Sequence, residues 1–201
     1  MRTRGPTADR TLPTGGSSTA DRPWTASSRK GARASADMKK IAKTAGITLL
    51  LLVVGTFVSL RLLGYEPSDQ RPGLWLTGER ASEPTTDWSF TEDHQEIFVQ
   101  TRTPYLIPHS VTTYCALHDG DLYIFSAYYE GGVFPDERGW NRNVMRNPRV
   151  RLKIGDGVFD QTLSHITDAE TRLAVHASFV AKYPEWSSPG LENVHILRVG
   201  D

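Results

Sequence analysis

The fold of this chain is decided by residues 149–166, which read RVRLKIGDGVFDQTLSHI. Over residues 149–154 aliphatic side chains alternate with basic ones, and a period of two is typical of a β-strand with one buried face. The Gly155-Asp156-Gly157 segment then predicts a turn into a second strand over residues 158–166. This stretch therefore predicts a β-hairpin.

More strands are predicted on both sides of this hairpin. Residues 111–117 and 122–126 are rich in β-forming residues and flank the segment His118-Asp119-Gly120-Asp121. An Asp-Gly pair between such runs is a strong hairpin signal. Alternation of apolar and polar residues predicts one strand over residues 97–102, and a last strand is predicted over residues 194–199.

Two helices complete the pattern. Residues 140–147 have helical character and are stopped by Pro148. Residues 167–170 have the shape of a capping box, and the apolar stripe behind them predicts a helix that ends near Tyr183-Pro184. Short antiparallel strands in this number favour a mainly β (α+β) fold, a small closed barrel with helices outside, because closure removes exposed strand edges.

The charges are divided between the two ends of the chain. The formal net charge is zero, but residues 1–43 carry ten basic and three acidic side chains, whereas residues 64–201 carry twelve basic and twenty acidic ones. The acidic part lacks the basic footprint that nucleic-acid binding needs, so we expect no nucleic-acid partner. The single cysteine, Cys115, excludes an internal disulfide and a zinc site built on several thiolates.

Other chemistries find no local support in the sequence. It contains no His-Glu-x-x-His, Gly-x-Ser-x-Gly or Gly-x-x-x-x-Gly-Lys pattern, which are the local signals of metalloproteases, α/β-hydrolases and P-loop proteins. The six histidines are scattered without metal-ligand spacing. We therefore predict no metal site.

Between the two charge blocks the chain is apolar. Residues 45–60 read AGITLLLLVVGTFVSL, and residues 61–63 extend this run to about the roughly 30 Å thickness of a hydrocarbon core. We predict a transmembrane helix over residues 41–63. Basic residues cluster directly before it, so the positive-inside rule places the N-terminus in the cytoplasm and residues 64–201 outside the cell membrane.

A cleaved secretory signal is the competing interpretation of this segment. No Ala-x-Ala site and no lipobox cysteine follow the apolar run, which favours an uncleaved signal anchor. Residues 1–37 have almost no aliphatic residues and are predicted to be a disordered basic tail. Met38 opens a well-formed signal-anchor start, and we hypothesise that it is the natural translation start. Residues 64–94 are predicted to be a linker whose apolar Leu74-Trp75-Leu76 knot docks on the folded domain at residues 95–201.

Three segments carry a resemblance to a known family: residues 119–126 (DGDLYIFS), 140–143 (WNRN) and 147–155 (NPRVRLKIG). They resemble the FMN-binding split-barrel superfamily, to which pyridoxamine 5'-phosphate oxidase-like proteins and deazaflavin-dependent nitroreductases belong. The resemblance covers roughly residues 95–199 and is most specific in the Trp-x-x-Asn and Asn-Pro-x-Val patterns. It implies a six-stranded split barrel with two flanking helices, usually a homodimer, which binds FMN or a deazaflavin and passes a hydride or electrons to a small molecule.

The resemblance also implies where the cofactor binds. The residues expected near a phosphate are Arg102, His109, Ser110, Arg142 and Arg146. The residues expected along the ring and the substrate groove are Ser126, Tyr128, Trp140 and Asn143. In such proteins the side chains position the ring, whose own chemistry transfers the hydride, so no residue is assigned a catalytic role.

One loop departs from the family's pattern. The deazaflavin branch carries a Thr-x-Gly-Arg-Lys-Ser-Gly-like turn between its first two strands, whereas residues 102–110 of this chain read RTPYLIPHS. The glycines are absent, but Arg102, His109 and Ser110 in this segment could still bind a phosphate or another anion. The choice between FMN and a deazaflavin therefore stays open, as does cofactor binding itself.

Each candidate residue also has a plainer structural interpretation. Trp140 can close the mouth of the barrel by packing there, and His109 can have a structural role. The basic residues of 149–153 can form the solvent-exposed face of a strand. Two functions remain. The first is a membrane-anchored flavin- or deazaflavin-dependent oxidoreductase acting on an unknown small molecule. The second is a non-catalytic split barrel that binds a ligand or a protein partner at the cell surface. The missing glycines and the external location favour the second function, whereas the Trp-x-x-Asn segment and the basic cluster favour the first.

Overall fold

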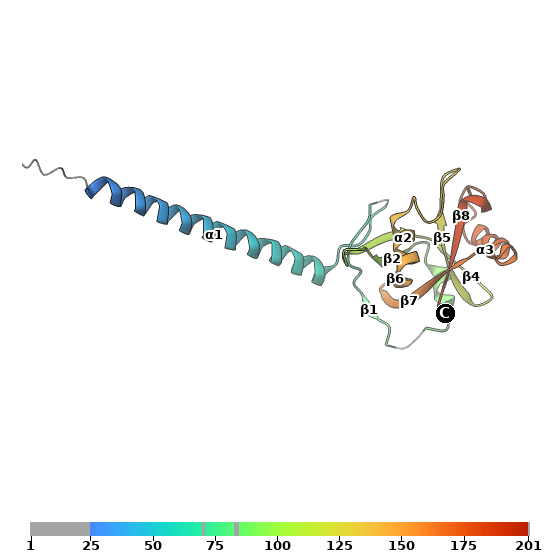
Figure 1. The fold of residues 1–201 in the computed structure, drawn as a ribbon. Helices are drawn as coiled ribbons and strands as arrows, with labels where there is room; N and C mark the ends of the chain where they lie inside the picture. Colours follow the sequence, from blue (N-terminus) through green and yellow to red (C-terminus); the bar gives the residue numbers. More distant parts are fainter. Residues whose placement is uncertain (1–24, 70, 83–84, 201) are drawn as a thin grey trace, which may run out of the picture. The chain divides into compact units, whose positions relative to one another are not determined.

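The computed structural model describes residues 25–69, 71–82 and 85–200 of the chain (Figure 1). Most of the tail that we predicted to be disordered lies outside these residues. The chain divides into two compact units, of which one ends at Leu51 and the other begins at Leu52.

The long helix α1 runs from Thr25 to Leu63. Its segment Asp37–Leu63 is long and apolar enough to cross a membrane, with a mean hydropathy of 2.2. The helix begins upstream of the predicted span, so residues 25–37, for which we expected disorder, are helical. Alanine and basic residues, which are strong helix formers, recur in this segment and extend the helix that the apolar run establishes.

The second unit is a mainly β barrel. Its strands are β2 (Ile97–Arg102), β3 (Pro108–Thr113), β4 (Cys115–His118), β5 (Asp121–Ala127), β6 (Arg149–Ile154), β7 (Gly157–Ile166) and β8 (Val194–Val199). Their hydrogen-bonded order is β3-β2-β6-β7-β8-β5-β4. Because β3 and β4 follow each other directly in the chain, the two ends of this order are joined and the sheet closes. With β3 and β4 counted as one bent strand, the predicted six-stranded split barrel with flanking helices is confirmed.

The bend between β3 and β4 corrects the single strand predicted over residues 111–117. β3 pairs with β2, whereas β4 pairs with β5, so the strand changes partner at Tyr114. The Tyr114 carbonyl accepts a hydrogen bond from the Phe125 backbone N–H at 3.2 Å, and the Thr113 hydroxyl donates to the Phe125 carbonyl at 2.6 Å. These bonds keep the ladder closed across the bend.

The turn between β4 and β5 has the conformation that its sequence predicts. Asp119 and Gly120 have φ angles of 51° and 84°, and two consecutive positive φ angles are the property of a type I′ hairpin turn. Apart from the adjacent residues Asp119 and Asp121, no described residue has a heavy atom within 4 Å of the position that a Cβ at Gly120 would take. The need for glycine at this position is therefore conformational and not steric.

Replacing Gly120 with alanine should lower the free energy of unfolding by roughly 1–2 kcal/mol, the usual cost of a left-handed conformation for an L-residue. Chemical denaturation of the full chain in detergent, followed by near-UV circular dichroism, measures this. The matched control is Gly139→Ala at the start of a helix, where φ is not positive. Equal stability of Gly120→Ala and the parent chain would contradict the turn assignment.

Two helices flank the barrel. The first is α2 (Gly139–Arg146), and the second is α3 (Ala169–Lys182). The Asp168 carboxylate accepts a hydrogen bond from the Thr171 backbone N–H at 2.8 Å and so caps α3, one residue later than the predicted capping box. The Phe179 ring of α3 stacks on Phe125 of β5 with the ring centroids 3.5 Å apart, which fixes the helix on the outer face of the sheet.

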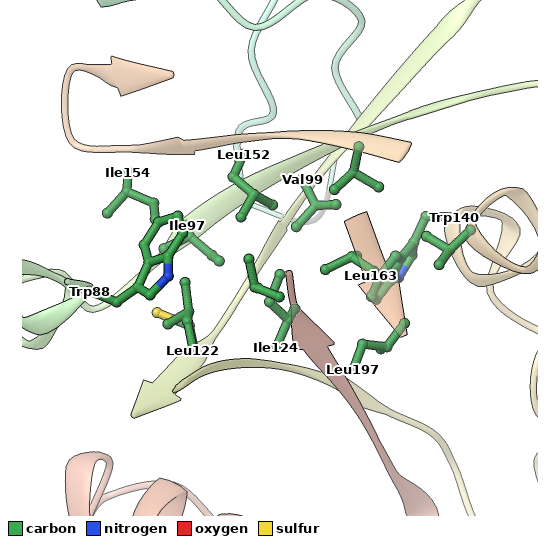
Figure 2. Close-up of a cluster of buried hydrophobic side chains, with 14 residues drawn as sticks. Trp88, Ile97, Val99, Leu122, Ile124, Trp140, Leu152, Ile154, Leu163 and Leu197 are labelled. Atoms are coloured by element: carbon green, nitrogen blue, oxygen red, sulfur yellow. The ribbon is translucent and has the colours of Figure 1, made fainter. Parts of the chain in front are cut away.

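The barrel interior is filled by aliphatic side chains from both halves of the sheet (Figure 2). Trp88 and Trp140 lie at opposite ends of this cluster in Figure 2, with the aliphatic side chains between them. Along β5, Leu122 and Ile124 point into this cluster, whereas the alternate residues pack under α3. Strand β5 is therefore buried on both faces, which explains its almost continuous apolar sequence.

The segment predicted as a linker is packed on the barrel. Trp75 and Leu76 are buried, as expected for the apolar knot, and Gly73 forms a backbone bridge with Ser110 of β3. Strand β1 (Glu79–Arg80) pairs in parallel with β7, and the short 3-10 helix η1 (Ser89–Asp93) follows. Because Trp88 belongs to the barrel core, the folded unit starts upstream of the predicted boundary at residue 95.

Candidate functional site

Helix α2 anchors a buried polar network at its N-terminal end. The Asn141 side-chain amide donates to the Ser126 hydroxyl at 2.6 Å and to the Tyr128 hydroxyl at 2.7 Å. All three residues are buried, and the Asn141 Oδ1 has no hydrogen-bond partner among the described residues. Burial raises the pKa of Tyr128, so its hydroxyl keeps its proton at neutral pH. The network ties α2 to the end of β5.

Replacing Asn141 with alanine should destabilise the barrel by about 2–3 kcal/mol, because two buried hydroxyls lose their donor. Thermal denaturation compared with a matched asparagine variant, Asn193→Ala, measures this, because the Asn193 amide bonds an exposed carbonyl. A melting temperature of Asn141→Ala equal to that of the control would show that the network does not hold α2.

A second polar network lies at the C-terminal end of α2. The Asn143 amide donates to the Thr101 hydroxyl at 3.0 Å, and that hydroxyl donates to the His109 carbonyl at 3.2 Å. Arg146 donates to the Asn143 Oδ1 at 3.2 Å and to the carbonyl of Arg102. Asn143 and Arg146 therefore hold the end of β2, from which the Arg102 side chain extends.

A groove of about 750 Å³ opens beside the end of β2. Most of its polar lining comes from β2, β6 and β7, including Gln100, Arg102, Arg149, Arg151, Asp160 and Gln161. The Arg151 guanidinium binds Asp160 through two hydrogen bonds of 2.7 and 3.0 Å, which lower the pKa of the Asp160 carboxyl. Arg102 and Arg149 are exposed, and within the described ranges neither guanidinium has an ion-pair partner. Arg61 near the end of α1 also lines the groove, is exposed and has no ion-pair partner among the described residues, so the groove presents three uncompensated cations.

This donor set fits the phosphate of a flavin-type cofactor. Arginine binds phosphate with two parallel hydrogen bonds, and the guanidinium groups of Arg61, Arg102 and Arg149 all line one groove. The groove lies within the range of roughly 300–1,000 Å³ that is usual for ligand sites. The amides of Gln100 and Gln161 offer donors and acceptors to the polar edge of a ring system. Arg102 is the one predicted site residue that lines this groove.

The other residues predicted near a phosphate lie elsewhere. His109 is on strand β3 and not in a loop, and burial lowers the pKa of its ring, which is therefore neutral at pH 7. Ser110 is fully buried and is bridged to Gly73, so its hydroxyl does not line the groove. Arg142 donates to the Asp136 carbonyl in the loop before α2. The bridge between Gly73 and Ser110 joins distant parts of the sequence, so the local motif gave no sign of it.

The residues predicted along the cofactor ring do not line the groove either. Trp140 packs in the barrel core, as its structural interpretation had it. Ser126 and Tyr128 are tied to Asn141, and Tyr128 also lines a second hollow of about 580 Å³ near Glu130 and Glu192. Acidic side chains at this hollow do not favour an anionic ligand. Asn143 does not line the first groove, but its Oδ1 accepts a hydrogen bond from Arg146, which also donates to the Arg102 carbonyl.

Sequence reasoning missed part of the groove. Arg149 was interpreted as part of a solvated strand face, which agrees with its exposure, but the groove that it lines also includes Gln100 of β2 and Gln161 of β7. The register of β6 brings the three strands together, because Arg149 lies opposite Thr162 of β7 and Arg151 lies between Gln100 of β2 and Asp160 of β7. The cluster of basic residues on β6 was the only signal in the sequence.

A histidine pair near the second hollow was also missed. The Phe134 ring stacks on His165 and on His195 with centroid distances of 4.1 and 4.6 Å. The Tyr128 ring meets His195 edge-on at 4.9 Å. Burial lowers the pKa of His165, and burial, His165 and Arg172 together lower the pKa of His195 to about 4. Both rings are therefore neutral at pH 7 and pack as aromatic groups.

The stability of the barrel should fall as the pH is lowered from about 6.5 to about 4. In this window the unfolded chain binds a proton at His195 that the folded chain does not bind, so the free energy of unfolding decreases with falling pH. Melting temperatures measured across this range should decline, and His195→Phe should flatten the decline. An equally steep decline of the melting temperature in His195→Phe and in the parent chain would show that His195 is not the cause.

Across the described parts of the chain no group of three or more His, Cys, Asp or Glu residues is placed to hold a metal ion. No protein-family model and no curated protein matches the chain.

Several solved structures are similar to this chain. One is a candidate 5-nitroimidazole antibiotic resistance protein from Bacteroides thetaiotaomicron, with 15% identity over 66% of this chain and 84% of that one and a TM-score of 0.45. A candidate pyridoxamine 5'-phosphate oxidase from Listeria innocua has 19% identity over 55% of this chain and 86% of its own, with a TM-score of 0.42. An F420-H2-dependent reductase has 22% identity over 53% of this chain and 94% of its own, with a TM-score of 0.41.

This chain has a split-barrel fold. That statement stands on its own strand order and closure.

Proposed function

We propose that the chain is a membrane-anchored oxidoreductase of the split-barrel type that uses FMN or a deazaflavin to reduce or oxidise a small molecule. The observation that carries this proposal is the groove with three guanidinium groups that have no ion-pair partner among the described residues, those of Arg61, Arg102 and Arg149, on a split barrel. The resemblance of residues 140–155 to the superfamily supports it.

Each residue of the groove has a distinct part in this proposal. Arg102 and Arg149 bind the cofactor phosphate, and Arg146 holds the Arg102 backbone in place. Arg151 is bound to Asp160 and so stays fixed in the wall. The Gln100 Oε1 accepts the Leu76 backbone N–H at 2.7 Å, which leaves its amide N–H groups to orient a ring edge. The bound ring would supply the hydride or electron transfer itself.

Anchoring and topology belong to the same proposal. Helix α1 contains a segment that is long and apolar enough to span a bilayer, and the basic residues before it favour an N-terminus in the cytoplasm. The barrel then lies outside the cell membrane. Protease added to intact cells should remove the barrel, and loss of the barrel only after permeabilisation would contradict this topology. The homodimer that the resemblance implies is tested by the mass of the detergent-solubilised protein.

Cofactor titration tests the proposed activity. The full chain, purified in detergent, is titrated with FMN and with a deazaflavin coenzyme, and binding is followed by the change in cofactor fluorescence. We expect saturable binding of one of them that Arg149→Gln weakens by about tenfold, the loss of one charge-assisted contact. Arg71→Gln, an exposed arginine outside the groove lining, is the matched control and should bind as the parent chain does.

Absence of binding in this titration would favour the second function, a non-catalytic split barrel that binds a ligand or a protein partner. The observation on its side is that Ser110 and Trp140, two of the predicted cofactor residues, are buried in the structure. The groove would then hold another anion, since its free cations remain.

A further inference from the structure

The loop between β2 and β3 presents apolar side chains to solvent. Tyr105, Leu106 and Ile107 are 84%, 73% and 48% exposed. Exposed apolar side chains gathered at one place indicate an interaction surface more often than isolated ones do. The segment 101–110, which contains these three residues, has no glycine that would make the loop flexible.

The loop is a defined turn. The Thr103 backbone N–H donates to the Ile107 carbonyl at 3.0 Å, and the Leu106 N–H donates to the Thr103 carbonyl at 3.0 Å. The Thr103 hydroxyl accepts the Ile107 N–H at 3.2 Å. Leu106 has a positive φ of 63°, a conformation that is rare for a large aliphatic residue. The backbone is therefore held in a conformation that projects the apolar side chains outward.

The chain that leaves α1 is fastened beside this loop. After Leu63 the chain forms a turn closed by Tyr65, whose N–H donates to the Trp75 carbonyl at 3.0 Å. Gly73 in this turn exchanges two backbone hydrogen bonds of 2.9 and 3.1 Å with Ser110 of β3. Ser110 lies three residues after Ile107, which is about 10 Å along an extended strand. The end of α1 and the apolar loop are therefore tied to the same strand.

The groove gives an independent sign of the same arrangement. Arg61 near the end of α1, Trp75 and Leu106 all line it. The Phe57 and Trp75 rings are in edge contact with their centroids 5.1 Å apart. Tryptophan and tyrosine are enriched where a protein meets the membrane–water interface, and an arginine at the end of a span extends into the headgroups. The apolar loop thus lies near the level at which the helix leaves the bilayer.

We propose that Tyr105, Leu106 and Ile107 form a membrane-contact surface that enters the headgroup–acyl boundary of the bilayer beside α1. The partner is the lipid surface itself. Two apolar side chains enter the acyl region and the tyrosine lies at the headgroups, as in other interfacial segments. This inference rests on the proposed anchoring by α1, and it does not depend on cofactor binding.

A fluorescent label at the loop tests the inference. The full chain carrying Leu106→Cys is labelled with an NBD maleimide and reconstituted into vesicles of phosphatidylcholine and phosphatidylglycerol. Native Cys115 is fully buried, and burial raises its pKa to about 11, so it stays unlabelled. The matched control is Tyr129→Cys, at another loop residue that is 80% exposed. The unsubstituted chain treated with the same reagent is the blank.

We expect the label at residue 106 to shift its emission to shorter wavelength in vesicles, with several-fold higher intensity and quenching by brominated acyl chains. The label at residue 129 should behave as in water. Equal emission at both positions in protein that floats with the vesicles would overturn the membrane-contact surface but leave the anchoring intact. Failure of the chain to float would overturn the anchoring and this inference with it. A label at 106 that is shielded in vesicles but not quenched by brominated acyl chains, in a protein of dimer mass, would overturn the lipid contact and show that a second copy covers the loop.

Discussion

Replacing Trp140 with alanine should lower the free energy of unfolding of the barrel by about 3–5 kcal/mol, the usual range for removal of a buried aromatic side chain. Trp140 is 7% exposed and packs with Val144 and the aliphatic core of the barrel. The substitution leaves a cavity that the closed sheet cannot fill by collapse, because its strands are hydrogen-bonded on both sides. Denaturation of the full chain in detergent, followed by near-UV circular dichroism, measures the loss.

Two further variants separate the structural role of Trp140 from a role in cofactor binding. Tyr129→Ala removes an aromatic ring that is 80% exposed, and we expect a change within about 0.5 kcal/mol. Trp140→Phe keeps most of the apolar volume and should retain both the fold and cofactor binding. Loss of cofactor binding in a stable Trp140→Phe protein would contradict the placement of this residue in the core alone.

Replacing both Arg102 and Arg149 with glutamine should weaken binding of a phosphate-bearing cofactor by roughly a hundredfold or more, since each charged hydrogen bond contributes about 1.5–3 kcal/mol. Both side chains are exposed, so the stability of the barrel should not change. Fluorescence titration of the double variant against the parent chain measures the loss. The variant Arg138→Gln, at the other end of α2 and outside the groove lining, is the control. Unchanged affinity in the double variant would exclude the groove as the phosphate site.

Much of the fold could be predicted from the sequence because its hairpins have local signals. The alternation over residues 149–154 and the Gly-Asp-Gly turn define β6 and β7 without any long-range information. The break at Tyr114 could not be predicted, because the residues on both sides of it favour strands and the cause is a change of pairing partner. Closure of the barrel depends on that change.

The site was harder to predict than the fold. A motif such as Trp-x-x-Asn marks a helix whose residues meet distant strands, and burial then decides the role of each residue. Trp140 enters the core, whereas Asn143 reaches Thr101 on β2. Ser110 is covered by Gly73, which lies 37 residues earlier in the sequence. No local pattern reports such a pairing, and the same is true of the His165 and His195 rings that meet across Phe134.

The location of the cofactor phosphate is the central claim, and a comparison of FMN with riboflavin tests it most directly. The ratio of the two dissociation constants measures the phosphate contribution alone, because the ring is the same; a deazaflavin coenzyme and its phosphate-free form serve in the same way. In the parent chain we expect the phosphorylated form to bind much more tightly, and in Arg102→Gln/Arg149→Gln we expect the two forms to bind almost equally. A ratio that is the same in both proteins would contradict the account.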